Sequence, residues 1–336
     1  MCELELGLRP KEFCVYVHRD KPSNHALLAM HKRVLPIHNA FLPLFDVCHK
    51  LGGLGVSSME LCKLWGDDRK HLTTRTRQHI DFTAEETAEA HRQCKMLGIN
   101  PNTPFVPLLA RDNTYLQQIK EPTELDSYRN VEIDTFIPAL EYIADRYKTI
   151  RMGSVVKSPL KTNHPNILDY SLSGKRTELL DIYLSGKCHF FFSSATGLDG
   201  LASLVFRKPV LYVDFMPISR APILKPGCML IPKQYWHVEE KRYLTLSELL
   251  ESGMADMATP RQLNPKGIVV HDNTSQEILE AVKEMTARLD GSWIETVEDK
   301  ERREQFWSHY KRLSPDNICV GLIGSAFLKN NPHWLR

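Results

Sequence analysis

Short apolar runs alternate with stretches of helical periodicity over residues 103–290, and this alternation constrains the fold more than any other feature of the chain. The runs that we expect as strands are 105–110, 147–152, 189–192 and 209–214. The stretches that we expect as helices are 133–144, 177–185 and 198–206. Strands that alternate with helices favour a parallel sheet, because parallel neighbours require a crossover connection. We therefore expect an α/β fold with a doubly wound, Rossmann-like lobe.

Three further helix starts carry a Thr that is followed three residues later by Glu, at Thr83, Thr245 and Thr274. In such a capping box the hydroxyl and the carboxylate accept hydrogen bonds from backbone N–H groups that have no partner inside the helix. Gly291 follows the third of these helices and can end it in a left-handed conformation. Ser23 is expected to cap an earlier helix.

The length of 336 residues favours two domains, at ~150 residues each. We expect a small N-terminal lobe over 1–102, with a strand at 13–17 and a hinge at its end. A second lobe spans 103–292 and contains the alternation of strands and helices. Residues 293–336 are expected to form a charged helix and an aromatic tail that packs back on the lobes.

Composition places the chain among ordinary globular proteins that do not bind nucleic acid. Lys and Arg are spread along the sequence and the formal net charge is +2, which is a weak electrostatic footprint for such a partner. The eight cysteines stand singly, without zinc-site spacing. No stretch approaches the ~20 apolar residues of a membrane span. We expect a cytoplasmic protein, with peripheral contact at the inner face of the membrane left open.

The apolar run at 189–192 ends in small polar residues, directly before an expected helix. These residues are Ser193, Ser194, Ala195, Thr196 and Gly197. At the carboxyl end of a parallel strand, small side chains let a ligand approach the backbone, hydroxyls donate hydrogen bonds, and a helix start favours an anion. A diphosphate fits these properties. A plain Ser/Thr-capped helix with Gly in a tight turn is the other interpretation.

Two more of the expected strands end in Arg. Arg111 and Asp112 follow the first strand, with Tyr115 close behind, and Arg151 ends the second strand just before Gly153. An Arg can clamp phosphate through two parallel N–H donors, and Asp112 can orient it or accept a hydroxyl. The alternative is a surface Arg–Asp pair at a turn, which carries little energy.

Arg129 precedes the helix expected at 133–144 and can reach the same crevice, although a turn with a solvated Arg is the favoured interpretation. The sequence contains no GxSxG, HExxH, P-loop or GxGxxG motif. Hydrolase triads, zinc proteases and dinucleotide oxidoreductases are therefore disfavoured.

Several segments together resemble bacterial glycosyltransferases associated with surface polysaccharide synthesis. They are ARDNTYL (110–116), SYRNVEIDTFIPALEYIADR (127–146), IRMG (150–153), LLDIYLSGKCHFFFSSATGL (179–198) and FRKPVLYVDF (206–215). The resemblance implies a GT-B-like fold, with two Rossmann-like lobes of parallel sheets facing a cleft and an N-terminal, acceptor-side lobe that is small or truncated. The Arg-Asp strand end and the serine loop are also similar to the donor site of fucosyltransferase-type enzymes.

By this resemblance the chain is expected to transfer a sugar from a nucleotide-sugar donor to a hydroxyl of a glycan or lipid-linked acceptor. Arg111, Asp112 and Arg151 would act in catalysis. The donor would be bound by Ser193, Ser194, Thr196, Gly197, Gly153, Tyr115 and Arg129. We expect no cofactor besides the donor and no metal, because the sequence has no evident DxD-type carboxylate pair for Mg²⁺.

Two other functions remain open at this point. One is a sugar-nucleotide epimerase or hydrolase on the same scaffold, which would need no sugar acceptor or would release free sugar. The other is a nucleotide-sugar-binding or scaffold protein without catalysis, which would bind the donor and leave it unchanged.

Overall fold

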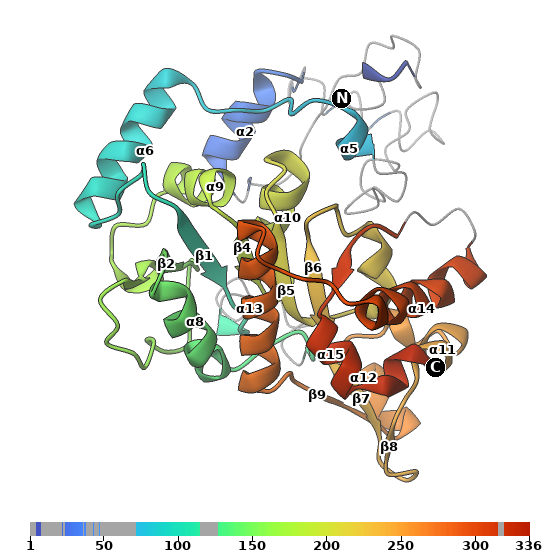
Figure 1. The fold of residues 1–336 in the computed structure, drawn as a ribbon. Coiled ribbons are helices and arrows are strands. Elements are labelled where there is room, and N and C mark those ends of the chain that lie inside the picture. Colours follow the sequence, from blue (N-terminus) through green and yellow to red (C-terminus); the bar gives the residue numbers. More distant parts are fainter. Residues whose placement is uncertain are drawn as a thin grey trace.

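The computed structural model describes residues 5–7, 22, 24–35, 37, 43, 47, 72–114, 127–314 and 319–336. The strand expected at 13–17, the cap expected at Ser23 and the donor contact expected at Tyr115 lie outside the described residues. The central element is a seven-stranded sheet with helices on both faces (Figure 1).

All neighbouring strands in this sheet are parallel. The strands are β1 (Phe105–Leu109), β2 (Lys148–Arg151), β3 (Ile167–Asp169), β4 (Phe191–Ser193), β5 (Val210–Phe215), β6 (Met229–Pro232) and β10 (Leu322–Ile323). Their order is β3-β2-β1-β4-β5-β6-β10, in which the chain reverses its direction of travel between β1 and β4. The first six positions follow the doubly wound Rossmann order, so the predicted α/β, Rossmann-like parallel sheet is confirmed.

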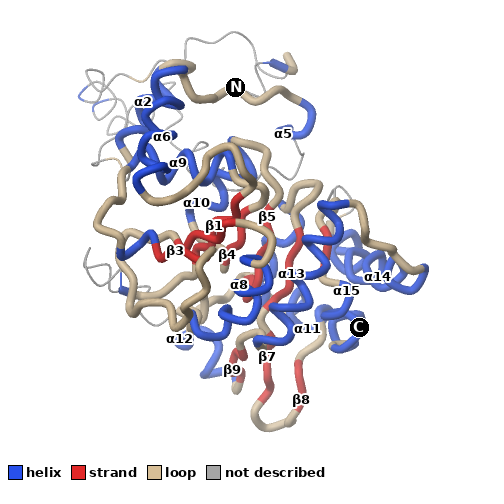
Figure 2. Tube along the Cα trace, turned by 60° about the vertical axis from the view of Figure 1, so that its left-hand side comes forward, coloured by secondary structure: helices blue, strands red, loops and turns tan. Residues whose placement is uncertain are grey.

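Crossover helices form one layer on each face of the sheet. One layer contains α8 (Ile137–Ala144), which follows the 3₁₀ helix η3 (Ile133–Phe136), together with α13 (Ser275–Asp290) and α15 (Ser325–Asn330). The other contains α9 (Glu178–Lys187), α10 (Gly197–Gly200) and the π-helical turn η5 (Leu201–Val205), with α2 (His25–Lys32) and α6 (Ala84–Met96) packed on α9. Figure 2 shows α2, α6 and α9 side by side.

The remaining elements lie at the edges of this three-layer body. A small antiparallel sheet contains β7 (Gln234–His237), β8 (Arg242–Tyr243) and β9 (Ile268–His271). The other α-helices of the described ranges are α5 (Leu72–Arg75), α11 (Leu246–Glu251), α12 (Pro260–Leu263) and α14 (Val297–Leu313). Short 3₁₀ turns are η4 (Tyr170–Leu172), η6 (Ile218–Ile223), η7 (Met254–Asp256), η8 (Asn264–Lys266) and η9 (Pro332–Leu335). In the described ranges, no helix has the length and apolarity needed to cross a membrane.

The predicted helix starts are confirmed where the signal is local. Thr83, Thr245 and Thr274 each form a capping box, and Gly291 ends α13 with a φ of 77°. The N-cap of α2 is Asn24. The Asn24 side chain accepts a hydrogen bond from Leu27 N at 2.8 Å and donates another to the Glu178 carbonyl at 3.1 Å, which ties α2 to α9.

Pro107 lies in the middle of β1, a central strand, although Pro has no N–H to donate to a ladder. The carbonyl oxygens of Phe105 and Leu109 accept hydrogen bonds from His189 N and Ser194 N, on the side of β4. Backbone N–H and C=O groups of successive residues in a strand point to opposite neighbouring strands, so the backbone of Pro107 faces β4, as the backbones of Phe105 and Leu109 do. The missing hydrogen bond is therefore confined to the pairing with β4, which is only three residues long.

Helix α6 belongs to the same body as the sheet. Ala90 and Cys94 of α6 are fully buried and join the core cluster that contains Phe105 of β1. Across the described ranges, all parallel strands lie in one sheet. A second Rossmann-like lobe, as the GT-B architecture requires, is therefore not part of the described structure.

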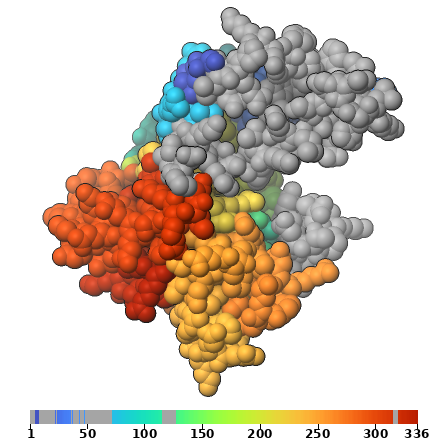
Figure 3. Space-filling model, turned by 90° about the vertical axis from the view of Figure 1, so that its right-hand side faces the viewer, coloured from blue at the N-terminus to red at the C-terminus, as the bar shows by residue number. Residues whose placement is uncertain are grey.

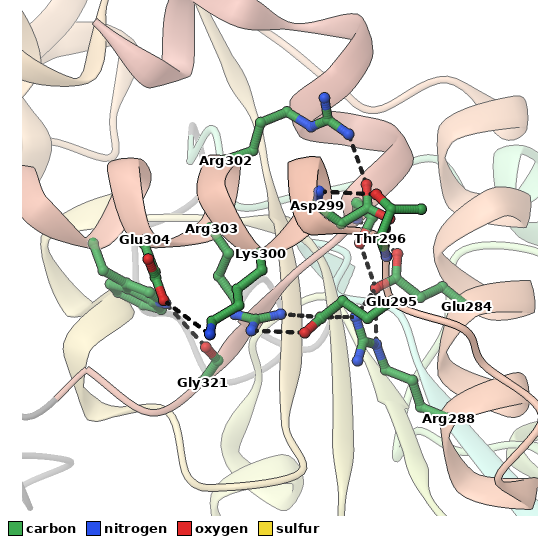
Figure 4. A network of polar contacts seen from close by, with 12 residues as sticks. Glu284, Arg288, Glu295, Thr296, Asp299, Lys300, Arg302, Arg303, Glu304 and Gly321 are labelled. Atoms are coloured by element: carbon green, nitrogen blue, oxygen red, sulfur yellow. Dashed lines mark hydrogen bonds and ion pairs between the residues drawn. The ribbon is translucent and has the colours of Figure 1, made fainter.

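The C-terminal segment is bound to the sheet and to α13. Leu322–Ile323 adds β10 beside β6, and Trp334 is fully buried. In the space-filling view the red C-terminal residues lie against the orange surface of the helices before them (Figure 3). Figure 4 shows Glu295 between Arg303 and Arg288, whose Nη2 atoms lie 3.0 Å and 2.9 Å from the two Glu295 oxygens. This pairing connects α13 to the start of α14.

Candidate functional site

The carboxyl ends of β1 and β4 meet where the strand order reverses, which is the place where open α/β sheets bind ligands. The backbone N–H of Arg111 donates to Ser194 Oγ at 2.8 Å, and Ser194 N donates to the Leu109 carbonyl at 3.2 Å. Ser194 is 1% exposed. Its hydroxyl therefore holds the two strand ends together and does not face a ligand.

The other hydroxyls of this loop converge on Asp199, in the first turn of α10. Ser193 Oγ donates to Asp199 Oδ2 at 2.6 Å, Thr196 N donates to the same oxygen, and Thr196 Oγ1 lies 3.4 Å from it. Ala195 takes a left-handed φ of 61°, a strained conformation for a residue with a Cβ. The loop is thus an internally hydrogen-bonded cap around one carboxylate.

Burial raises the pKa of Asp199 to about 6, against the opposing effect of the Ser193 and Thr196 hydrogen bonds and of the nearby Arg129 charge. Within the described part of the chain, Oδ1 of Asp199 accepts no hydrogen bond, and this side chain lines a cavity. A carboxyl group with these properties can exchange a proton near neutral pH. Sequence reasoning missed Asp199, although the spacing Thr196-x-x-Asp199 is the same capping-box signal that was used elsewhere.

The cavity has a volume of about 400 Å³ and lies between the helix that begins at Gly197 and the connection from β5 to β6. That connection contains the six-residue 3₁₀ helix η6, with Pro222 inside it, in place of a full crossover α-helix. Apolar lining comes from Leu27, Ala195, Leu201, Leu204, Val205, Phe215, Met216, Pro217, Ile223 and Leu224. The short connection leaves this part of the sheet face uncovered, which accounts for the space.

Charged side chains surround this apolar lining. Three are cationic: Arg129 is half-buried, Arg220 is exposed, and Lys225 is only 6% exposed. Arg129 Nη2 donates to the Ala195 carbonyl at 2.8 Å, which places its guanidinium beside the loop after β4. Among the described residues that line the cavity, the acidic side chain is Asp199. The excess of positive charge favours an anionic ligand.

Other predicted site residues hold the neighbouring loops. Asp112 accepts hydrogen bonds from Thr114 N at 2.9 Å and from Lys157 N at 3.0 Å, so its carboxylate joins the loops after β1 and β2. Arg151 is 3% exposed and its Nη1 lies 3.2 Å from Asp169 Oδ2. These groups lie on the side of β2 and β3 and do not line the 400 Å³ cavity.

Gly153 and Arg111 are two further predicted site residues that do not line the cavity. Gly153 has a φ of 147°, and a Cβ there would lie 2.8 Å from Val156 Cγ1, so the backbone itself requires glycine. Arg111 is half-buried beside the loop that contains Ser194. Of the predicted site residues in the described ranges, Arg129, Thr196 and Gly197 line the cavity.

A second titratable cluster lies at the carboxyl ends of β5 and β6. Asp214 N donates to Asn273 Oδ1 and Asn273 N donates to Asp214 Oδ1, both at 2.6 Å. Lys233 is 1% exposed and donates to Asp272 Oδ1 at 2.5 Å and to the Asn130 carbonyl at 2.8 Å. Burial raises the pKa of Asp214 to about 7, while the Lys233 charge lowers it. The cluster joins the main sheet to the segment after β9.

Among the described residues, no three His, Cys, Asp or Glu side chains come together in a way that could hold a metal ion. Comparisons with protein-family models, curated proteins and solved structures found no match.

Proposed function

We propose that the chain is a glycosyltransferase that moves a sugar from a nucleotide-sugar donor to a hydroxyl of a glycan or lipid-linked acceptor. The observation that carries the proposal is the position of the cavity. It opens beside the loop after β4, at the carboxyl edge of a sheet with Rossmann strand order, and next to the point where that order reverses. Its cationic lining fits a ligand that carries phosphates.

In this proposal the donor diphosphate lies between Arg129 and the start of α10. Gly197 is the first residue of α10 and is exposed, and nothing lies within 4 Å of the position that its Cβ would take. A phosphate can therefore approach the backbone at a helix start, where N–H groups have no partner inside the helix. The Arg129 guanidinium supplies the charge that offsets the leaving diphosphate.

Asp199 makes this arrangement sensitive to pH. Its carboxylate already accepts the Thr196 N–H at the helix start, so an ionised Asp199 repels a diphosphate placed there. Because burial raises the pKa of Asp199 to about 6, protonation below that pH relieves the repulsion. We therefore expect donor binding to tighten as the pH falls from 8 to 5.5. The roles of Arg111, Asp112 and Arg151 in catalysis stay predictions.

The direct test is a calorimetric titration with UDP-, GDP-, CMP- and dTDP-sugars, using Gly197→Glu and Gly197→Gln as a matched pair. Both side chains enter open space. Both side chains obstruct the approach to the backbone to a similar extent, but only the carboxylate repels the diphosphate, so we expect the Glu variant to bind the donor more weakly than the neutral Gln variant. Equal affinities in both variants, or binding of no nucleotide class by the folded chain, would remove the donor site from this place.

Product analysis then separates the reactions. Transfer requires an acceptor hydroxyl, an epimerase changes the donor without one, and a hydrolase releases free sugar. Donor binding without any turnover, over a panel of acceptors, would instead identify the chain as a nucleotide-sugar-binding protein.

A further inference from the structure

The apolar part of the cavity extends along the sheet, well away from the proposed diphosphate position. Ser193 pairs with Tyr212, which places Ala195 at the level of Asp214 on β5, and Met229 pairs with Leu211, which places Cys228 at the level of Val210. These two levels are separated along the strand by about 13 Å, at ~3.3 Å of rise per residue. Both Ala195 and Cys228 line the cavity. The space between these levels is therefore long enough for an extended chain.

Two glycines keep the wall of the cavity open. Gly200 has φ −62° and ψ −37°, which is ordinary helical geometry that any residue can adopt. A Cβ at Gly200 or at Gly197 would have no atom within 4 Å, and both residues line the cavity. Gly186, by contrast, has the Phe206 ring 2.9 Å from its Cβ position, so packing explains it. Glycine is less favourable in a helix than residues with a side chain, and neither backbone geometry nor packing requires it at Gly200. We therefore attribute Gly200 to the open space of the cavity.

The lining also distinguishes among ligand types. A nucleobase in the part of this space that is lined by Leu204, Ile223 and Leu224 would turn its ring donors and acceptors toward side chains that cannot pair with them. A hydrocarbon has no such groups to satisfy. The hydroxyls of Ser203 and Tyr212, which also line the cavity, lie 3.5 Å from each other. Cations stand near both ends, with Arg129 at the carboxyl edge and the buried Lys225 three residues before Cys228.

We propose that this cavity binds an amphiphilic anion: a linear hydrocarbon chain that ends in a phosphate or carboxylate. The chain lies along η5 and η6, and a cationic side chain of the lining pairs with the head group. This inference goes beyond the proposed glycosyl transfer, because it assigns a ligand to the apolar space whichever reaction the protein carries out.

The test is a calorimetric series with hexyl, octyl and decyl phosphate, with decanoate, neutral decyl glucoside and inorganic phosphate as comparisons. Each added CH₂ should tighten Kd about fourfold until the space is filled, because a buried CH₂ contributes about 0.8 kcal/mol. The neutral glucoside and inorganic phosphate should bind more weakly than decyl phosphate. The difference in affinity between decyl phosphate and decanoate shows whether the cavity prefers a phosphate or a carboxylate head group. Affinity that does not depend on chain length overturns the proposal.

Substitution of Gly200 shows whether binding occurs in this space. Gly200→Leu should weaken decyl phosphate binding tenfold or more without lowering Tm, because the side chain fills the cavity at a helical position. Glu301→Leu adds the same side chain on an exposed face of α14 and should bind as the wild type does. If Gly200→Leu lowers Tm, Gly200→Ala gives the smaller version of the same change. Unchanged binding in a folded variant overturns the proposal.

The experiments test the amphiphile site and the donor site independently of each other. Loss of alkyl phosphate binding in Gly200→Leu, with nucleotide-sugar binding intact, supports the amphiphile site whatever becomes of the donor site. Loss of nucleotide-sugar binding in Gly200→Leu, together with alkyl phosphates that show no chain-length dependence, assigns the space to the nucleoside and overturns this inference. Failure of the Gly197→Glu test alone bears only on the donor site.

Discussion

Replacing Asp199 by Asn should change how the stability of the protein depends on pH. Burial raises the pKa of this carboxyl from 3.8 to about 6, so the folded protein binds a proton there at a pH where the unfolded chain does not. The shift of about 2 pH units corresponds to about 3 kcal/mol in total, at ~1.4 kcal/mol per unit. The ionised form is the costly one. The contribution of the Asp199 carboxyl to the free energy of unfolding of the wild type therefore falls as the pH rises from 4 to above 6.

Asn at this position does not titrate, so the difference in unfolding free energy between Asp199→Asn and the wild type isolates the effect. From pH 5 to pH 8 that difference should shift by about 1.4 kcal/mol in favour of the variant. Urea unfolding at each pH measures it, and the other buried carboxyls cancel in the subtraction. Ser193→Ala removes a hydrogen bond that lowers this pKa, so it should move the window to higher pH. A difference that stays constant from pH 5 to 8 would show that Asp199 does not titrate in this range in the folded protein.

Three further substitutions test other parts of the structure. Lys233→Met should destabilise the protein by about 3 kcal/mol, and more at pH 8 than at pH 5, because it leaves the Asp214 carboxylate buried without its cation; equal losses at both pH values in urea unfolding would contradict this. Gly153→Ala should cost about 2 kcal/mol, since it combines a φ of 147° with a 2.8 Å approach to Val156, and an unchanged Tm would show that the loop relaxes. Thr274→Ala should cost about 1 kcal/mol through loss of the α13 cap, measured against Thr274→Ser, which keeps a hydroxyl and should lose far less.

The features that sequence reasoning predicted are those set by neighbours in the chain. The strand at 105–110 and the capping box at Thr274 each follow from residues within one turn or one strand, and both are present with shifts of one residue or less. The capping of α2 by Asn24 also involves a residue that is distant in sequence, because the Asn24 side chain donates a hydrogen bond to the Glu178 carbonyl.

The position of the serine loop in the sheet was predicted, but the orientation of its hydroxyls was not. Strand alternation placed the serine loop at the carboxyl edge, beside the end of β1, and it lies there. The types of the residues did not indicate where their hydroxyls point. Ser193 turns to Asp199 and Ser194 turns to Arg111, because a buried hydroxyl must find a partner inside the protein. The cavity exists because the short β5–β6 connection leaves part of the sheet face uncovered. This uncovered face depends on how the helices pack on the sheet, which the local sequence does not indicate.

We propose that an anionic nucleotide sugar binds at the cavity between Arg129 and the start of α10. A crystal structure of the protein with the nucleotide sugar that binds most tightly tests this placement. We expect density for the two phosphates within hydrogen-bonding distance of the Arg129 guanidinium and beside the Gly197 backbone. Phosphates bound at Arg151 on the β2 side, or at a different face of the sheet, would contradict it.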